Sequence, residues 1–153
     1  MEGESMGIEC FVSEESLRIH KEHLCALRMK KEICITHRER EDLEVQIRSH
    51  ELYFSSFRRE RVPCERVRAG YRSENDFCFE LLEYVKRQRF GFLYIYPMAR
   101  YPFVGFGTEE KNLARAALAL DLWEHAYFLD YGFDYISYLK AALSHLDFSR
   151  LKQ

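Results

Sequence analysis

The sequence predicts an α+β protein: an N-terminal antiparallel helical hairpin packed on a C-terminal lobe that combines strands with helices. Two segments with helical periodicity, joined by a short link, fill most of the first 57 residues. Aromatic and β-branched residues then concentrate in two short runs between Phe90 and Phe106. We therefore expect a helical hairpin over residues 1–57, a linker over 58–75 and an α/β lobe over 76–153.

The first helix is expected to begin after Ser13 and to run to about residue 34. A serine at this position can accept a hydrogen bond from the first helical turn, where Glu14 and Glu15 also suit the positive end of the helix dipole. The apolar face of this helix includes His20. His23 follows within one turn, and we expect it to be exposed to solvent.

A second helix is expected over roughly residues 39–57, with Gln46, His50 and Tyr53 on one stripe. Because the link between the two helices is short, they should run antiparallel. The following arginine-rich stretch contains Pro63 and Gly70 as helix breakers. It predicts a solvated linker, since runs of charge usually form exposed surface.

The C-terminal lobe is expected to place strands between two helices. A helix is predicted over 76–88, followed by two antiparallel strands over 90–96 and 101–106. Residues 114–121 remain ambiguous, because their alanines favour a helix while their position suits a third strand. A terminal helix is predicted over 135–152.

Composition excludes several classes of protein. A net charge of −2 argues against nucleic acid or an anionic membrane as the main partner. No apolar run approaches the roughly 20 residues that span a bilayer. The polar, acidic N-terminus does not resemble a secretory signal, and five cysteines without a C-x-x-C pair fit reduced thiols. We expect a cytoplasmic protein.

The segment from Asp121 to Tyr127 carries the strongest chemical signal in the chain. Asp121 and His125 are four residues apart, a spacing that suits two ligands of one metal. His20 and His50 lie far upstream on the two predicted helices. Three histidines and one aspartate form a ligand set suited to iron or manganese as well as to zinc.

These residues resemble the iron/manganese superoxide dismutases. The stretch Asp121–Tyr127 is similar to the D-x-W-E-H-A-Y signature of that family, and Leu129–Tyr131 continues the match. The stretch Ser13–His20 resembles the part of the family's first helix that leads up to the first histidine ligand. The stretch Gln46–Phe54 resembles the Q-x-x-N-H-x-x-Y-W segment that carries the second one. The resemblance covers most of the chain.

The resemblance implies a three-stranded antiparallel sheet in the C-terminal lobe and one metal ion between the lobes. The implied ligands are His20, His50, Asp121 and His125. Gln46 and Tyr53 are the implied catalytic residues: Gln46 as hydrogen-bond donor to a solvent molecule at the metal, and Tyr53 as a wall of the pocket. The implied reaction converts superoxide to oxygen and hydrogen peroxide by alternating oxidation and reduction of the metal.

Iron is favoured over manganese by the position of Gln46. It precedes His50 by four residues, so both project from one helix face. In the iron enzymes the solvent donor lies at this place, whereas in most manganese enzymes it comes from the sheet region. The chain has no glutamine between Gln88 and Gln153. The resemblance also implies a homodimer through Glu124, which would bond to His125 of a partner subunit.

The chain departs from the family pattern at several positions. Leu24 and Arg28 stand where the family has a second histidine and an active-site tyrosine. Tyr135 replaces an arginine near the substrate funnel, and Phe128 replaces a tyrosine that reaches across the dimer. These differences leave a second hypothesis open, a non-catalytic relative that binds metal or a protein partner. A weaker third option is a hydrolytic zinc site, because the same ligands can activate water.

Overall fold

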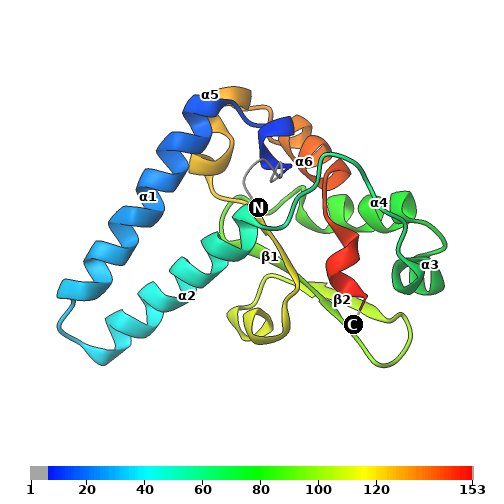
Figure 1. The fold of residues 1–153 in the computed structure, drawn as a ribbon, viewed down its shortest axis with the longest axis horizontal. Helices are drawn as coiled ribbons and strands as arrows, with labels where there is room; N and C mark the ends of the chain where they lie inside the picture. Colours follow the sequence, from blue (N-terminus) through cyan, green and yellow to red (C-terminus); the bar gives the residue numbers. More distant parts are fainter. Residues whose placement is uncertain (1–6, 153) are drawn as a thin grey trace.

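The N-terminal part of the protein is a helical hairpin, as the sequence predicts. In the computed structural model, which describes residues 7–152, a short 3-10 helix η1 (Ile8–Cys10) precedes α1 (Glu14–Ile33) and α2 (His37–Phe54). Ser13 caps α1 by accepting a hydrogen bond from the Ser16 backbone N–H at 3.1 Å, which confirms the predicted start. Figure 1 shows α1 and α2 side by side, projecting from the rest of the molecule.

The C-terminal lobe is built on a three-stranded antiparallel sheet in the order β2-β1-β3. The strands are β1 (Phe92–Pro97), β2 (Val104–Gly107) and β3 (Leu118–Asp121). The ambiguous stretch before Asp121 therefore divides into a 3-10 helix, η2 (Glu110–Arg115), and a strand. Phe92 pairs with Asp121, so the aspartate of the sequence motif ends the edge strand.

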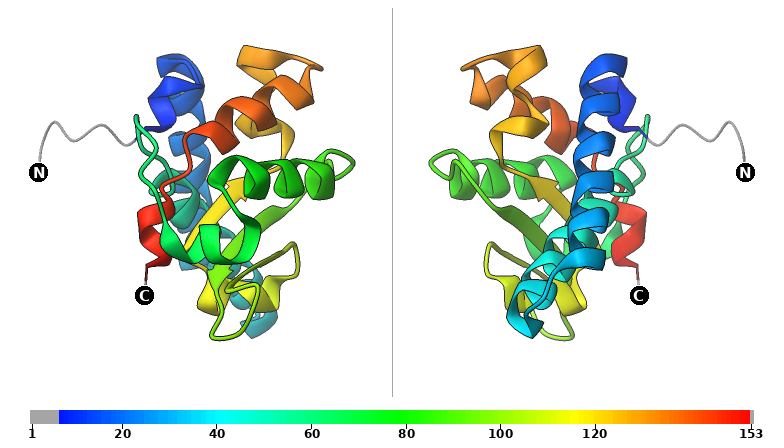
Figure 2. Two further views of the ribbon diagram at one scale, coloured as in Figure 1. Left: turned by 90° about the vertical axis from the view of Figure 1, so that its right-hand side faces the viewer. Right: turned by 90° about the vertical axis from the view of Figure 1, so that its left-hand side faces the viewer.

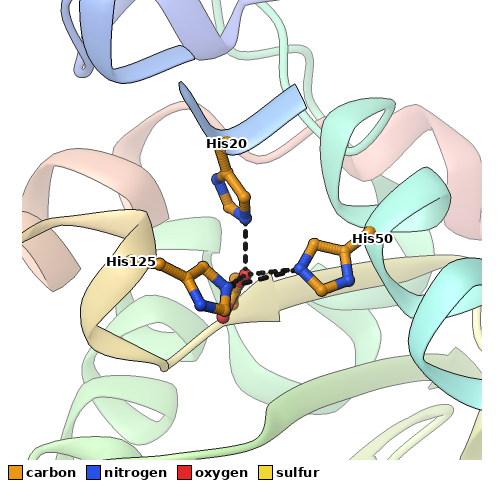
Figure 3. A group of neighbouring side chains, drawn as sticks. His20, His50 and His125 are labelled. Atoms are coloured by element: carbon orange, nitrogen blue, oxygen red, sulfur yellow. Dashed lines mark hydrogen bonds and ion pairs between the residues drawn. The ribbon is translucent and has the colours of Figure 1, made fainter. Parts of the chain in front are cut away.

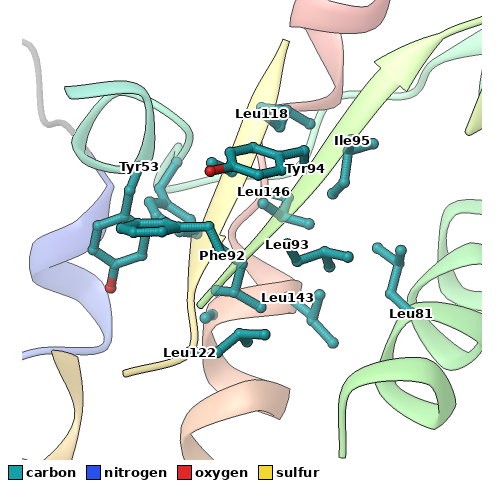
Figure 4. Close-up of a cluster of buried hydrophobic side chains, with 14 of the residues drawn as sticks. Tyr53, Leu81, Phe92, Leu93, Tyr94, Ile95, Leu118, Leu122, Leu143 and Leu146 are labelled. Carbon is teal, nitrogen blue, oxygen red and sulfur yellow. The ribbon is translucent and has the colours of Figure 1, made fainter. Parts of the chain in front are cut away.

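The two faces of β1 pack against different helices, because successive side chains in a strand point in opposite directions. Leu93 and Ile95 are fully buried on the side of α4 (Glu74–Val85) and α6 (Tyr135–Ser144), as Figure 4 shows. Phe92 and Tyr94 face α2, where the Tyr94 hydroxyl lies 2.6 Å from Ser49 Oγ. The sheet therefore lies between α2 on one side and the pair α4 and α6 on the other (Figures 1 and 2).

The prediction of a solvated linker over residues 58–75 is wrong for the part of this segment that forms a helix. A helix, α3 (Glu65–Tyr71), lies in this segment, and the side chains of Cys64 and Val67 are buried in the core. Glu74 is also buried, and it accepts hydrogen bonds from the Cys64 backbone N–H and from Arg68. The sequence pattern does not predict this helix, because its apolar side consists only of Val67 and Tyr71 and the neighbouring residues include several arginines.

The C-terminal helix is shorter than predicted. It ends at Ser144, after which Leu146 pairs with Phe57 in an isolated β-bridge and a 3-10 helix, η4, covers Phe148–Leu151. Between β3 and α6 lie two short helices, η3 (Glu124–Ala126) and α5 (Phe128–Tyr131). Over the described residues, none of the helices has the length and apolar character needed to cross a membrane.

Candidate metal centre

Four side chains from separate parts of the chain converge between the hairpin and the sheet (Figure 3). His20 comes from α1 and His50 from α2. Asp121 ends β3, and His125 lies on η3 directly after it. Each offers one potential ligand atom, and these atoms all lie within 4.8 Å of one another. The structure thus brings together all four residues that the sequence predicts as metal ligands.

A single carboxylate oxygen, Asp121 Oδ2, stands at the centre of the group. It lies 2.8 Å from Nε2 of His125 and 2.9 Å from Nε2 of His20. The Nε2 atom of His50 lies 3.5 Å from the same oxygen and 3.3 Å from Nε2 of His125. Donor atoms bound to one ion at about 2.0–2.1 Å are themselves roughly 3–3.5 Å apart. The spacing of the four side chains therefore fits a shared metal ion.

The protonation of His50 suits a metal ligand. Its Nδ1 lies 2.7 Å from the Gln46 backbone carbonyl, which can only accept a hydrogen bond, so Nδ1 carries the proton. Burial lowers the pKa of His50 to about 4, which keeps the ring neutral near pH 7. In this tautomer the lone pair of Nε2 points toward Asp121 and His125. A backbone partner that fixes the tautomer in this way is usual for histidine ligands of metals.

Asp121 is a buried carboxylate that stays ionised. Its burial alone would raise its pKa, but the hydrogen bond from His125 and the adjacent His20 imidazole outweigh that effect and hold the pKa below its usual range. Its second oxygen, Oδ1, accepts a hydrogen bond from the Trp123 backbone N–H at 2.9 Å. The group therefore combines one fixed negative charge with at least one neutral imidazole, His50.

His20 supplies a further sign that the group suits a cation. Its Nε2 is buried and, although 2.9 Å from Asp121 Oδ2, it makes no hydrogen bond of acceptable angle. A buried polar nitrogen without a hydrogen bond is costly, so such atoms in native proteins usually have a role. A metal ion among the four side chains would bind both this nitrogen and the lone pair on Nε2 of the buried His50.

The two predicted catalytic residues lie beside the cluster in different ways. Gln46 is half-buried one turn before His50, and its backbone carbonyl orients that ring. The Tyr53 ring packs 5.4 Å from the His20 ring, while its hydroxyl lies 2.9 Å from the Tyr138 hydroxyl. The phenol of Tyr53 therefore bonds to Tyr138, and its ring forms part of the wall around His20.

A fourth histidine lies at the edge of the group. His23 is half-buried, with its ring centroid 4.6 Å from that of His125 and 5.2 Å from that of His50. The expectation that it is exposed to solvent is therefore wrong. The sequence holds the signal that locates it, because residues three apart on a helix share a face and His23 follows His20 at this spacing.

Three residues at which the resemblance implies a departure from the family pattern make other contacts in the structure. Leu24 is buried in the core, and the Arg28 guanidinium pairs with the Glu51 carboxylate of α2 at 2.9 Å. Tyr135, where the resemblance implies an arginine, is buried, and its hydroxyl donates to the Val85 carbonyl at 3.3 Å. Arg89 stacks over the Tyr135 ring at 4.6 Å from its centroid.

Comparison with known protein families identifies one matching family. Residues 67–153 match the family described as iron/manganese superoxide dismutases, C-terminal domain. The match covers more than half of the chain and includes Asp121 and His125, while His20 and His50 lie before it. Comparison with curated proteins gave no match. By its matched region the chain belongs to the iron/manganese superoxide dismutase family.

Proposed function

We propose that this protein is a metal-dependent superoxide dismutase with one iron or manganese ion per chain. The observation that carries the proposal is the convergence of three imidazole nitrogens on one buried carboxylate oxygen. The proposed ligands are His20, His50, Asp121 and His125. Membership of a family whose members use iron or manganese supports the same conclusion.

The metal and the residues around it would have different roles in the proposed reaction. Bound iron or manganese would supply the alternating one-electron oxidation and reduction that turn two superoxide ions and two protons into oxygen and hydrogen peroxide. Asp121 provides the negative charge that attracts the cation, and His50 is held neutral with its lone pair available. Gln46 is proposed to donate a hydrogen bond to solvent in the site. Its position one turn before His50 favours iron over manganese.

The surface around His125 supports a homodimer. The His125 side chain is 30% exposed, although it belongs to the proposed ligand set. Large apolar side chains close to it in sequence are also exposed: Trp123, Phe128, Leu129 and Phe133. The exposed Phe90 ring packs 5.7 Å from the Trp123 ring. An exposed aromatic patch of this kind marks an interaction surface. We propose that a second copy covers it, with Glu124 of each chain bonding to His125 of the other, in a cytoplasmic dimer.

A non-catalytic, metal-binding relative is the alternative function. It is favoured by Leu24 and Arg28, which stand where the resemblance implies a second histidine and an active-site tyrosine. Leu24 packs in the core, and Arg28 forms an ion pair with Glu51. In this case the protein would keep the metal and the interaction surface but would not turn over superoxide at a useful rate.

Metal analysis combined with a superoxide assay tests the proposal. We expect the purified protein to contain stoichiometric iron or manganese and to consume superoxide, and His125→Ala to lose both properties. His37→Ala is the matched control, because this exposed histidine on α2 pairs with Glu41. Stoichiometric metal without superoxide consumption would establish the alternative. Turnover near the diffusion limit would exclude it.

A further inference from the structure

Two hydrogen bonds join the start of α1 to α5, the short helix that follows Asp121 and His125 in the chain. The Tyr131 hydroxyl donates to the Phe11 backbone carbonyl, and the Ser13 backbone N–H donates to Asp130 Oδ2 at 2.7 Å. The bonded residues are 120 and 117 positions apart in sequence. They join the N-terminal segment to α5 directly.

The residues on each side of this contact lie close in sequence to a proposed metal ligand. Ser13 caps α1 seven residues before His20, a helical distance of about 10 Å. On the other side, Asp130 lies on α5 five residues after His125, and only Tyr127 separates α5 from η3. Because a helix is stiff over two turns, a displacement at Ser13 is transmitted to His20.

The rest of α1 contacts the C-terminal lobe at η3, where the His23 ring packs 4.6 Å from the His125 ring. Beyond its first turns the helix packs mainly against α2, and the ion pair between Arg28 and Glu51 also joins these two helices. Figure 1 shows the far end of the hairpin extending away from the C-terminal lobe. The orientation of α1 relative to Asp121 and His125 therefore depends both on this contact with η3 and on how the N-terminal end of the helix is held.

We propose that Asp130 and Tyr131 are positioning residues of the metal site, which hold His20 at bonding distance from the ion that Asp121 and His125 bind. The inference rests on the proposed metal-binding function. Loss of either bond lets the first turn of α1 move, and the His20 nitrogen then adds less to metal affinity. Partners that bond directly to a metal ligand typically change metal affinity by about 10–100-fold, so residues that act one step further away should fall at the lower end of this range.

Titration of the full-length, metal-free protein with Mn²⁺, followed by electron paramagnetic resonance, tests the proposal. The signal of free Mn²⁺ gives the dissociation constant, and that of the bound ion reports its coordination. Mn²⁺ also prefers oxygen and nitrogen donors to the free cysteines of this chain. We expect Tyr131→Phe and Asp130→Ala to bind Mn²⁺ about 10-fold more weakly and with an altered bound spectrum.

Two further variants separate positioning from general stability. Asp130→Asn keeps an oxygen acceptor for the Ser13 N–H and should bind Mn²⁺ nearly as the wild type does. Asp134→Ala removes the cap of α6, where Asp134 accepts from the Ser137 backbone N–H at 3.1 Å. It should lose thermal stability but keep the wild-type affinity and spectrum.

The outcomes distinguish this inference from the function on which it rests. If Tyr131→Phe and Asp130→Ala lose thermal stability as Asp134→Ala does but keep the wild-type affinity for Mn²⁺, the positioning role is overturned and the metal site stands. If the wild type binds no Mn²⁺ at one ion per chain, the proposed metal site is overturned and the positioning role falls with it.

Discussion

The Tyr138 hydroxyl donates a hydrogen bond to the backbone carbonyl of Asp121 at 2.7 Å, beneath the proposed metal ligands. Because the single phenolic proton of Tyr138 is used in this bond, the contact with the Tyr53 hydroxyl at 2.9 Å must be donated by Tyr53. Burial raises the pKa of both phenols, so both remain protonated. A chain of two donors thus links α2 and α6 to the end of β3.

Tyr138→Phe should destabilise the protein by about 1–3 kcal/mol, because it leaves the Tyr53 hydroxyl and the Asp121 carbonyl buried without their partner. Tyr53→Phe should cost less, since the bond from Tyr138 to Asp121 remains. In the double variant the Tyr53 hydroxyl is no longer orphaned, so the total loss should be smaller than the sum of the two single losses. Urea unfolding of the four proteins measures this cycle. Additive losses would show that the two phenols act independently.

Glu74 gives a prediction for the pH dependence of stability. Its burial alone would raise its pKa, but hydrogen bonds from the Cys64 backbone N–H and from Arg68 lower it below the usual 4.5. A carboxyl group whose pKa is depressed on folding stabilises the protein above its unfolded pKa, and this contribution is lost as the pH falls through the folded pKa. Acidification below about pH 4.5 should therefore remove the stabilisation that Glu74 provides at neutral pH.

The comparison of Glu74→Gln with Glu80→Gln tests this prediction. Glu80 lies on the exposed side of the same helix, so its substitution should leave the pH profile unchanged. Glu74→Gln should lose about 1.5–3 kcal/mol at pH 7, typical of a hydrogen bond to a charged group, and should lose less on acidification than the wild type. Unfolding free energies measured from pH 7 to pH 3 give both quantities. Parallel profiles for Glu74→Gln and the wild type would contradict the assignment.

The hairpin could be predicted from local signals, and the four residues that converge between the lobes from the resemblance of short motifs. Ser13 caps the start of α1, and Asp121 and His125 lie four residues apart within one short motif. The helix α3 and the role of Tyr138 could not be predicted in this way. The apolar side of α3 is narrow and surrounded by arginines, and Tyr138 acquires its role only when α6 packs beneath β3.

The strand that ends in Asp121 shows a second limit of local patterns. Alanine favours helices in isolation, yet Ala119 lies in β3 with its backbone N–H bonded to Ser56 Oγ at 2.9 Å. All four residues of β3 are buried, so tertiary packing outweighs the intrinsic preference for a helix. A continuous apolar run cannot distinguish a buried strand from a buried helical segment.

Substitution in the exposed aromatic patch tests the proposed dimer. Phe128 is 47% exposed three residues after His125, and Phe128→Glu should weaken dimerisation because it places a charge at an apolar interface. The control is Ile35→Glu, at the 95% exposed turn between α1 and α2, which should leave the dimer intact. Sedimentation equilibrium at micromolar concentration measures both. A monomeric wild type would refute the proposed homodimer.

Removal of the metal should lower the thermal stability of the protein. A ligand that binds only the folded state at 100 times its dissociation constant stabilises that state by about 2.7 kcal/mol. For a domain of this size, 1 kcal/mol corresponds to about 2–4 °C, so metal at this excess should raise the melting temperature by about 5–10 °C. Calorimetry with Mn²⁺ and with a chelator measures the difference.

Asp121→Asn is the control for this metal effect. The amide nearly preserves the size of the carboxylate and keeps an oxygen that can accept the hydrogen bond from the Trp123 N–H, but it removes the charge that faces the three imidazoles. We expect the variant to fold and its melting temperature to be the same with Mn²⁺ and with chelator. A variant stabilised by Mn²⁺ as strongly as the wild type would show that the ion binds elsewhere, because no other charge among the four proposed ligands replaces that of Asp121.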